Sequence, residues 1–376
     1  MDNTNAMLPK RLSELDWLRV ILVFAVFLHH VGMPFNGDEW VIMNKESSKT
    51  LDDFMVYFEQ FRLPTLFMIA GVGAHLLLNK TRPLAFAIDK VKRLLIPLLI
   101  GILLIIPPQN YLKNPSEYES LLQAFPQLML RLDSMHLWFI EYLFVFSLLA
   151  IPFHYMLKSK SGERFVRLIS AVSQKWWGLL SLGLFLMVIR TGLKIPFPSD
   201  DKAIVNLSSS TFYLFFFLMG MVLSQKPDMW LRLGQRWREH SIALLILSGV
   251  FYFYYFVDFS AYGSVQILWS IWWALCSLLA WTAALSFMGL AQRFLTSTPA
   301  WLMKANTLIY PYYILHQTVI VICAYYIVGW SSGLGLKMTA LLLSSFIITS
   351  LLCLLVISPF NSMRFLFGVK KKKATR

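Results

Sequence analysis

The stretch LDWLRVILVFAVFLHH (residues 15–30) decides the fold class, because it is an apolar run that contains ionisable side chains. Extended to residues 16–34, it has about the twenty-residue length that crosses the hydrocarbon core of a bilayer as a helix. Arg19 and His30 are eleven residues apart, a spacing that returns to the same helix face with about 16 Å of rise. His29 lies about 100° round from that face. Ionisable residues inside a membrane span are functional by default, so this segment predicts both a membrane protein and a site.

Composition supports the same class over the whole chain. Of 376 residues, 57% are hydrophobic and only 14% are charged, which is typical of an all-α polytopic membrane protein. We expect ten spans, at residues 16–34, 55–78, 94–112, 136–156, 176–192, 210–225, 241–257, 265–290, 306–329 and 338–360. No linker, repeat or long polar stretch suggests a second domain, so residues 1–376 are expected to form one membrane domain.

The net charge of +14 is distributed in a way that indicates membrane topology rather than nucleic-acid binding. If the N-terminus is cytoplasmic, the segments on that side hold 24 of the 34 basic residues. Ten spans return the chain to the starting side, so both termini are predicted to be cytoplasmic. The basic tail, about residues 364–376, is expected to contact anionic lipids. The inner-side residues are Lys10, Arg11, Lys80, Arg82, Lys90, Lys92, Arg93, Lys158, Lys160, Arg164, Arg167, Lys175, Lys226, Arg232, Arg236, Arg238, Arg293, Lys304, Arg364, Lys370 to Lys373 and Arg376.

Four further ionisable residues lie in other predicted spans. Arg62 and His136 enter their spans from the outer side, Glu141 lies about a turn below His136, and His316 is near the middle of the ninth span. Arg62 and His136 have an alternative as snorkelling interface anchors, and His316 has one as a packing residue. A carboxylate at the depth of Glu141 needs a partner. The many Trp and Tyr residues are typical of interfacial belts and packing, and the three cysteines show no metal-like spacing.

Three cations, Lys90, Lys92 and Arg93, stand at the predicted cytoplasmic mouth of the third span. Lys90 and Arg93, in KVKRLLIP (residues 90–97), have a plain alternative as a positive-inside topology signal. Lysine and arginine are also suited to phosphate groups. An anionic cytoplasmic cosubstrate is therefore the functional interpretation of this segment.

These segments together resemble the acyltransferase 3 family of integral membrane O-acyltransferases. Arg19 and His30 match the family's basic residue and histidine in the first helix. FRLPTLFMIAG (residues 61–71) is similar to its second-helix segment, with Ala70 where serine is common, and Lys90 and Arg93 fit its basic motif, with lysine in place of the commoner arginine. The segments HLWF (residues 136–139) and YPYYILHQ (residues 310–317, from Tyr310) complete the match. The general layout is most similar to the glucan-modifying branch, which includes the succinyltransferase of osmoregulated periplasmic glucans.

The resemblance implies transfer of an acyl group, acetyl or succinyl, from cytoplasmic acyl-CoA to a hydroxyl of an extracytoplasmic glycan. It also implies a bacterial inner-membrane location, with acyl-CoA as cosubstrate and no permanently bound cofactor or metal. Acyl transfer needs a base for the hydroxyl proton and positive charge for the oxyanion. We expect His30 to be the base, Glu141 or another buried polar neighbour to orient it, and Arg19 to hold the donor or stabilise charge from the cytoplasmic side. Substrate binding is expected of Lys90, Arg93, Arg62, His136, His316 and Tyr310.

Two alternatives to direct transfer remain at this point. An acyl-histidine relay is chemically feasible because donor and acceptor approach from opposite faces. A proton-coupled transporter would also place His, Arg and Glu within the membrane. A purely structural membrane scaffold has little reason to bury so many charges.

Overall fold

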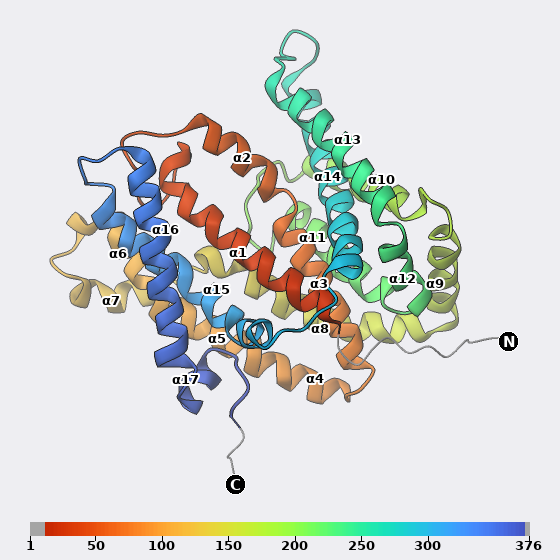
Figure 1. Cartoon of the computed structure of the whole chain (residues 1–376), viewed down its shortest axis with the longest axis horizontal. Helices are drawn as coiled ribbons and strands as arrows, with labels where there is room; N and C mark the ends of the chain where they lie inside the picture. The colour runs from red at the N-terminus through yellow and green to blue at the C-terminus, as the bar shows by residue number, and fades with distance from the viewer. Residues whose placement is uncertain (1–11, 373–376) are drawn as a thin grey trace. The chain divides into compact units, whose positions relative to one another are not determined.

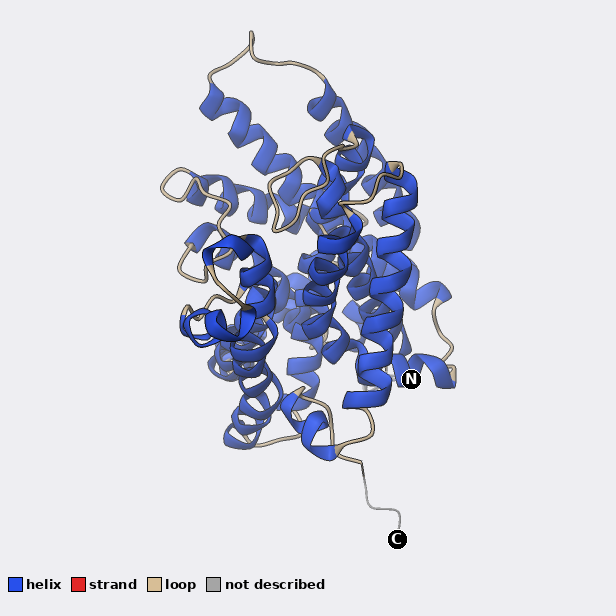
Figure 2. Ribbon diagram, turned by 90° about the vertical axis from the view of Figure 1, so that its left-hand side faces the viewer, coloured by secondary structure: helices blue, strands red, loops and turns tan. Residues whose placement is uncertain are grey.

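A computed structural model describes residues 12–372, and within them the chain forms helices and loops with no strand (Figure 2). The prediction of an all-α membrane bundle is confirmed. Lys10, Arg11, Lys373 and Arg376, which the topology prediction uses, lie outside the described residues. The described part divides into two compact units, and each combines separate stretches of sequence. The prediction of one domain stays a prediction.

Unit 1 contains the residues up to Arg19, Gln60–Ala87 and Val145–Pro299. Within it α13 and α14 lie side by side, α10 also packs on α14, and α3 packs on α11 (Figure 1). Its helices are α3 (Arg62–Leu78), α9 (Lys160–Val172), α10 (Gly178–Lys194), α11 (Leu207–Leu223), α12 (Pro227–Gln235), α13 (Trp237–Phe256) and α14 (Val265–Phe294).

Unit 2 contains Val20–Glu59, Ile88–Phe144 and the residues from Ala300 onward. The long helix α15 packs on α16 and on α6 (Figure 1). Its helices are α2 (Lys49–Glu59), α5 (Ile96–Ile100), α6 (Pro107–Lys113), α7 (Leu121–Leu130), α15 (Ala300–Ile327), α16 (Leu334–Leu351) and α17 (Asn361–Leu366), with π-helical η1 (Val91–Leu95), η2 (Gly101–Ile105) and η5 (Leu352–Ile357) and 3₁₀ turns η3 (Pro115–Glu117) and η4 (Met135–Leu137). Three helices have residues in both units: α1 (Ser13–Asn36), α4 (Pro83–Lys90) and α8 (Trp138–Lys158).

Every predicted span falls on a helix, but the number of spans differs from ten. Among the described residues, eight helical segments are long and apolar enough to cross a membrane. A ninth results if α11 and α12 form one span, although they are bent by 109° at their junction. The window at residues 176–192 corresponds to α10, whose 17 residues are shorter than a typical membrane-crossing helix.

Local sequence explains where several helices begin. Serine or asparagine precedes four of them, and its side chain accepts a hydrogen bond from a backbone amide in the first turn: Ser120 before α7, Ser159 before α9, Asn206 before α11 and Ser264 before α14. These caps satisfy amides that would otherwise lack a partner. Pro227 instead opens α12, where its missing N–H costs nothing.

Candidate active site

Three histidines from distant parts of the sequence meet in unit 2. The ring centroids of His30 on α1 and His316 on α15 are 5.1 Å apart. His136, in the turn η4 before α8, lies 5.4 Å from His316 and 6.5 Å from His30 by the same measure. His136 and His316 are buried, whereas His30 is partly exposed. We call these three residues the histidine cluster.

Backbone carbonyls determine which nitrogen of two of these rings carries the proton. His136 Nε2 lies 3.1 Å from the carbonyl oxygen of Ile314, and His316 Nδ1 lies 2.5 Å from that of Tyr313. A carbonyl oxygen only accepts hydrogen bonds, so each of these nitrogens is the N–H donor. The other nitrogens, His136 Nδ1 and His316 Nε2, keep their lone pairs.

These two lone pairs are buried and have no hydrogen-bond partner within residues 12–372. Leaving a buried polar atom unsatisfied costs about 1–3 kcal/mol. Such an atom calls for an explanation, for which a catalytic role, a water molecule or a bound ligand are candidates. The cluster therefore presents acceptor nitrogens that suit the hydroxyl groups of a substrate.

Aromatic side chains hold the cluster in place. The Tyr313 hydroxyl donates a hydrogen bond to the His136 backbone carbonyl, which ties α15 to η4. Phe27, on α1, packs edge-on against both Tyr312 and His316. Trp40 lies 6.3 Å from His30 between ring centroids. Rigid apolar neighbours of this kind fix the imidazole rings and limit the access of water.

A buried amide network beside the cluster is not predicted from the sequence. Gln109 on α6 donates to the Thr318 hydroxyl at 2.6 Å and accepts from the Gln317 amide at 3.0 Å. Thr318 in turn donates to the carbonyl oxygen of Ile105 in η2. Polar residues directly after His316 in an apolar span were the available signal. The network joins α6 and η2 to α15 at the histidine cluster.

The predicted donor-binding residues of the third span also lie in unit 2. Lys90 ends α4, and the Arg93 guanidinium pairs with Asp89 through Nε at 2.7 Å. Gly368, with φ +69°, sits where an added Cβ would be 2.6 Å from the Arg93 carbonyl oxygen and 2.8 Å from the Tyr310 ring. Tyr310 therefore lies beside the Arg93 backbone. It is six residues from His316 on α15, or about 9 Å of helical rise.

The remaining predicted site residues are distributed over both units. Arg19, in unit 1, pairs with Asp16 at 3.2 Å, and Arg62 is buried at the start of α3, also in unit 1. Glu141, in unit 2, is partly buried near the start of α8. Within the described residues it forms no hydrogen bond or ion pair with His30. Orientation of His30 by Glu141 therefore stays a prediction.

Across residues 12–372, no group of three or more His, Cys, Asp or Glu side chains has an arrangement that could hold a metal ion. The three cysteines are buried. The histidine cluster is thus described by its hydrogen bonds and aromatic contacts.

Comparison with known protein families decides how the cluster is interpreted. A family model described as an acyltransferase domain matches residues 12–358. The chain belongs to the acyltransferase 3 family. This confirms the resemblance predicted from the sequence motifs, and the family is one of acyl-transferring enzymes. No solved structure matches the chain.

Curated relatives add a more specific similarity. The chain is similar to glucans biosynthesis protein C of Escherichia coli K12, with 27% identity over 232 residues, and to that of Escherichia coli O1:K1, with 26% identity. Each alignment covers 57% of this chain and 59% of the relative. The chain therefore matches somewhat more than half of the length of these relatives.

Proposed function

We propose that this protein transfers an acyl group from cytoplasmic acyl-CoA to a hydroxyl group of an extracytoplasmic glycan. Membership of the acyltransferase 3 family supports the acyl transfer, and the name of the curated relatives supports a glucan as acceptor. An acetyl or a succinyl group is the expected cargo. The inner membrane of a bacterium is the expected location.

The observation that carries the proposal is the histidine cluster with its two buried lone pairs. Acyl transfer from a thioester to an alcohol needs a group that accepts the hydroxyl proton, and histidine suits this task near neutral pH. A carbohydrate offers several hydroxyls close together. His136 Nδ1 and His316 Nε2 could accept hydrogen bonds from such hydroxyls while His30 takes the proton of the one that reacts.

The proposed step is a direct displacement at the thioester carbon. The glycan oxygen forms a bond to the acyl carbon, the carbon–sulfur bond breaks, and coenzyme A leaves as a thiol after it receives a proton. The hydroxyl proton passes first to His30. Arg19, about 16 Å from His30 by helical rise along α1, would hold the donor from the cytoplasmic side.

The donor would reach the cluster along α15. Lys90 and Arg93 would hold the phosphates of coenzyme A, because both are cations near the start of the third span. Tyr310 lies beside the Arg93 backbone, and His316 follows on the same helix. Tyr310 and His316 are separated by about 9 Å of rise along α15. This helix would therefore join the donor site to the site of reaction.

The test is an assay of the purified, detergent-solubilised protein with acetyl-CoA or succinyl-CoA and a neutral glucan oligosaccharide. We expect time-dependent release of free thiol, together with a glucan product whose mass increases by that of the acyl group. A heat-inactivated sample is the control. Uptake of a labelled solute into proteoliposomes with no covalent product would contradict the proposal and favour a transporter.

A further inference from the structure

Unit 1 contains a cavity whose lining differs in character from the histidine cluster of unit 2. It encloses about 380 Å³ at the C-terminal end of α10, the first turns of α14 and the loop at residues 195–206. Its walls include Lys194, Asp200, Gln266, Trp269 and Trp273. A volume of this size is within the range of sites that hold small ligands.

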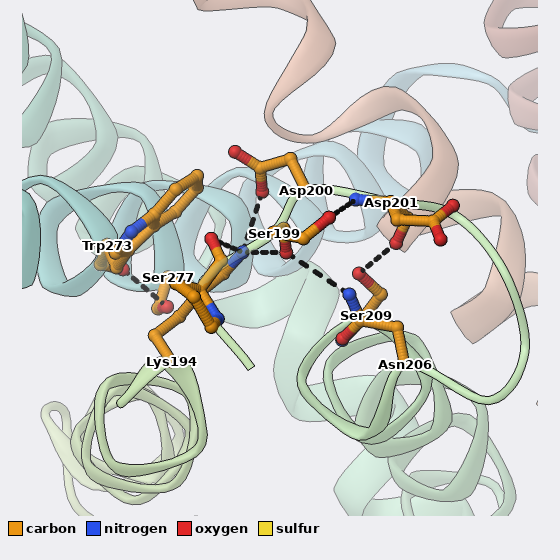
Figure 3. Close-up of polar contacts among 9 residues, drawn as sticks. Lys194, Ser199, Asp200, Asp201, Asn206, Ser209, Trp273 and Ser277 are labelled. Carbon is orange, nitrogen blue, oxygen red and sulfur yellow. Dashed lines mark hydrogen bonds and ion pairs between the residues drawn. The ribbon is translucent and has the colours of Figure 1, made fainter. Parts of the chain in front are cut away.

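The loop that forms one wall is tied down by hydrogen bonds (Figure 3). Lys194 Nζ donates to the carbonyl oxygen of Ser199 at 2.6 Å and to Asp200 Oδ1 at 2.8 Å. The Asn206 amide donates to the same Ser199 carbonyl, and the Ser209 hydroxyl donates to that of Asp201. These bonds order the wall before a ligand arrives, which lowers the entropic cost of binding.

Two tryptophans provide the flat wall of the cavity. Trp269 and Trp273, one helical turn apart on α14, have ring centroids 5.8 Å apart and planes inclined by 21°. Trp273 is buried beneath Lys194, whose Nζ lies 4.1 Å from its ring centroid, whereas Trp269 is 54% exposed. The inner ring is thus fixed by a cation–π contact, and the outer ring offers an open face.

The two charged side chains that line the cavity balance each other, and Arg190 lies outside the lining with its guanidinium carbon 4.9 Å from the Trp273 ring centroid. Lys194 pairs with Asp200, and its side chain is only 5% exposed. Gln266, Ser270 and Thr191 add neutral donors and acceptors. A tryptophan that only anchors the protein at the membrane interface explains one exposed ring. It does not explain a cavity with an ordered ion pair and an amide.

The chemistry of this lining matches one class of ligand. A neutral sugar ring has an apolar C–H face that stacks on an aromatic ring, and hydroxyls at its edge that pair with amide, hydroxyl and carboxylate groups. We propose that this cavity binds a neutral sugar residue of the acceptor glycan. The proposal rests on the proposed function for its choice of ligand, and on the predicted topology, which places residues 195–206 on the outer side.

The test is equilibrium binding of an unacylated β-linked glucohexaose to the full-length protein in detergent, measured by titration calorimetry without acyl-CoA. Trp269→Ala should raise the Kd about tenfold, which equals about 1.4 kcal/mol, because the stacking face for the sugar ring is lost. Trp176→Ala, which removes a similarly exposed tryptophan on the predicted cytoplasmic side of unit 1, should leave the Kd unchanged. Gln266→Ala should weaken binding by a smaller factor. Equal binding by the wild type and Trp269→Ala, or no binding by the wild type, would overturn the proposal.

The same variants separate this inference from the proposed function. Binding that depends on Trp269, in a protein that never releases thiol, would support the sugar site and refute the acyl transfer. Normal acyl transfer with an unchanged acceptor KM in Trp269→Ala would refute the sugar site and leave the acyl transfer standing.

Discussion

At the residue scale, the surroundings of each histidine decide whether it belongs to the site and which ring nitrogen keeps a lone pair. The chain has seven histidines, and three of them form the cluster. The carbonyl oxygens of Ile314 and Tyr313 hold two rings in opposite tautomers, so that one ring keeps a lone pair on Nδ1 and the other on Nε2. Because these acceptors belong to the backbone, substitution of a neighbouring side chain does not remove them.

We predict that His30→Ala lowers the rate of acyl transfer by about 10²-fold or more, which is the usual contribution of a general base. His29→Ala is the matched control, because its side chain points about 100° away on the same helix and should have a milder effect. Thiol release gives the rate, and acyl-CoA binding and membrane insertion show that each variant is folded. A near-normal rate in His30→Ala would transfer the role of base to His316 or His136.

At the element scale, the close approach of α3 and α11 depends on glycine. A Cβ added to Gly71 would lie 1.8 Å from the carbonyl oxygen of Phe217, and one added to Gly220 would lie 2.1 Å from that of Met68. Small residues allow membrane helices to pack backbone to backbone. In the sequence these glycines look like ordinary members of apolar spans, so only the packing shows their function.

The resulting prediction is that Gly71→Ala destabilises the protein by about 1–3 kcal/mol, the usual cost of overpacking, because a neighbouring backbone has to move. Gly73→Ala on the same helix meets nothing within 4 Å. It should leave stability unchanged or raise it, because alanine favours helix. Thermal unfolding in detergent measures both, and a lower midpoint for Gly73→Ala than for Gly71→Ala would contradict the packing argument.

The third span is interrupted by π-helical turns, and these hold a predicted donor-binding residue and a carbonyl of the buried amide network. Arg93 lies in η1, and the Ile105 carbonyl that accepts from Thr318 lies in η2. Single π-helical turns inside helices are frequent at functional sites. The hydrophobic pattern of the sequence shows the span but not these turns, because one extra residue per turn hardly changes the composition.

We predict that Lys90→Ala combined with Arg93→Ala raises the KM for acyl-CoA more than it lowers kcat, since charges that serve binding alone affect KM. Lys92→Ala, which removes an exposed cation from the same π-helical turn, is the control and should change neither constant. Steady-state kinetics at varied acyl-CoA gives both values. An unchanged KM in the double variant would show that this segment serves only as a positive-inside topology signal.

At the scale of the whole molecule, the distribution of basic residues predicts that both termini are cytoplasmic. Reporter fusions at residues 200 and 376 test this, with an outer location expected for the first and a cytoplasmic one for the second. The positive charges near the spans set their orientation in the membrane. A fusion at residue 376 that reports an outer location would show that this orientation is reversed, and with it the donor and acceptor sides.

The sequence by itself determined the fold class and the family, and it named His30, His136 and His316 as candidate site residues. Each of these follows from short-range properties: the length of apolar runs, and the spacing of His30, His136 and His316 within recognisable segments. The α11–α12 bend and the shortness of α10 changed the number of candidate spans, because hydropathy measures apolar length and not the direction of the chain.

Tertiary structure alone decided which residues meet. His30 and His316 are 286 positions apart, yet their rings lie 5.1 Å from each other, and no local pattern encodes such a contact. The same holds for the network of Gln109 with Gln317 and for the ordered loop beside Trp269 and Trp273. These features arise when distant helices pack, because buried polar atoms must then find partners or remain available for a ligand.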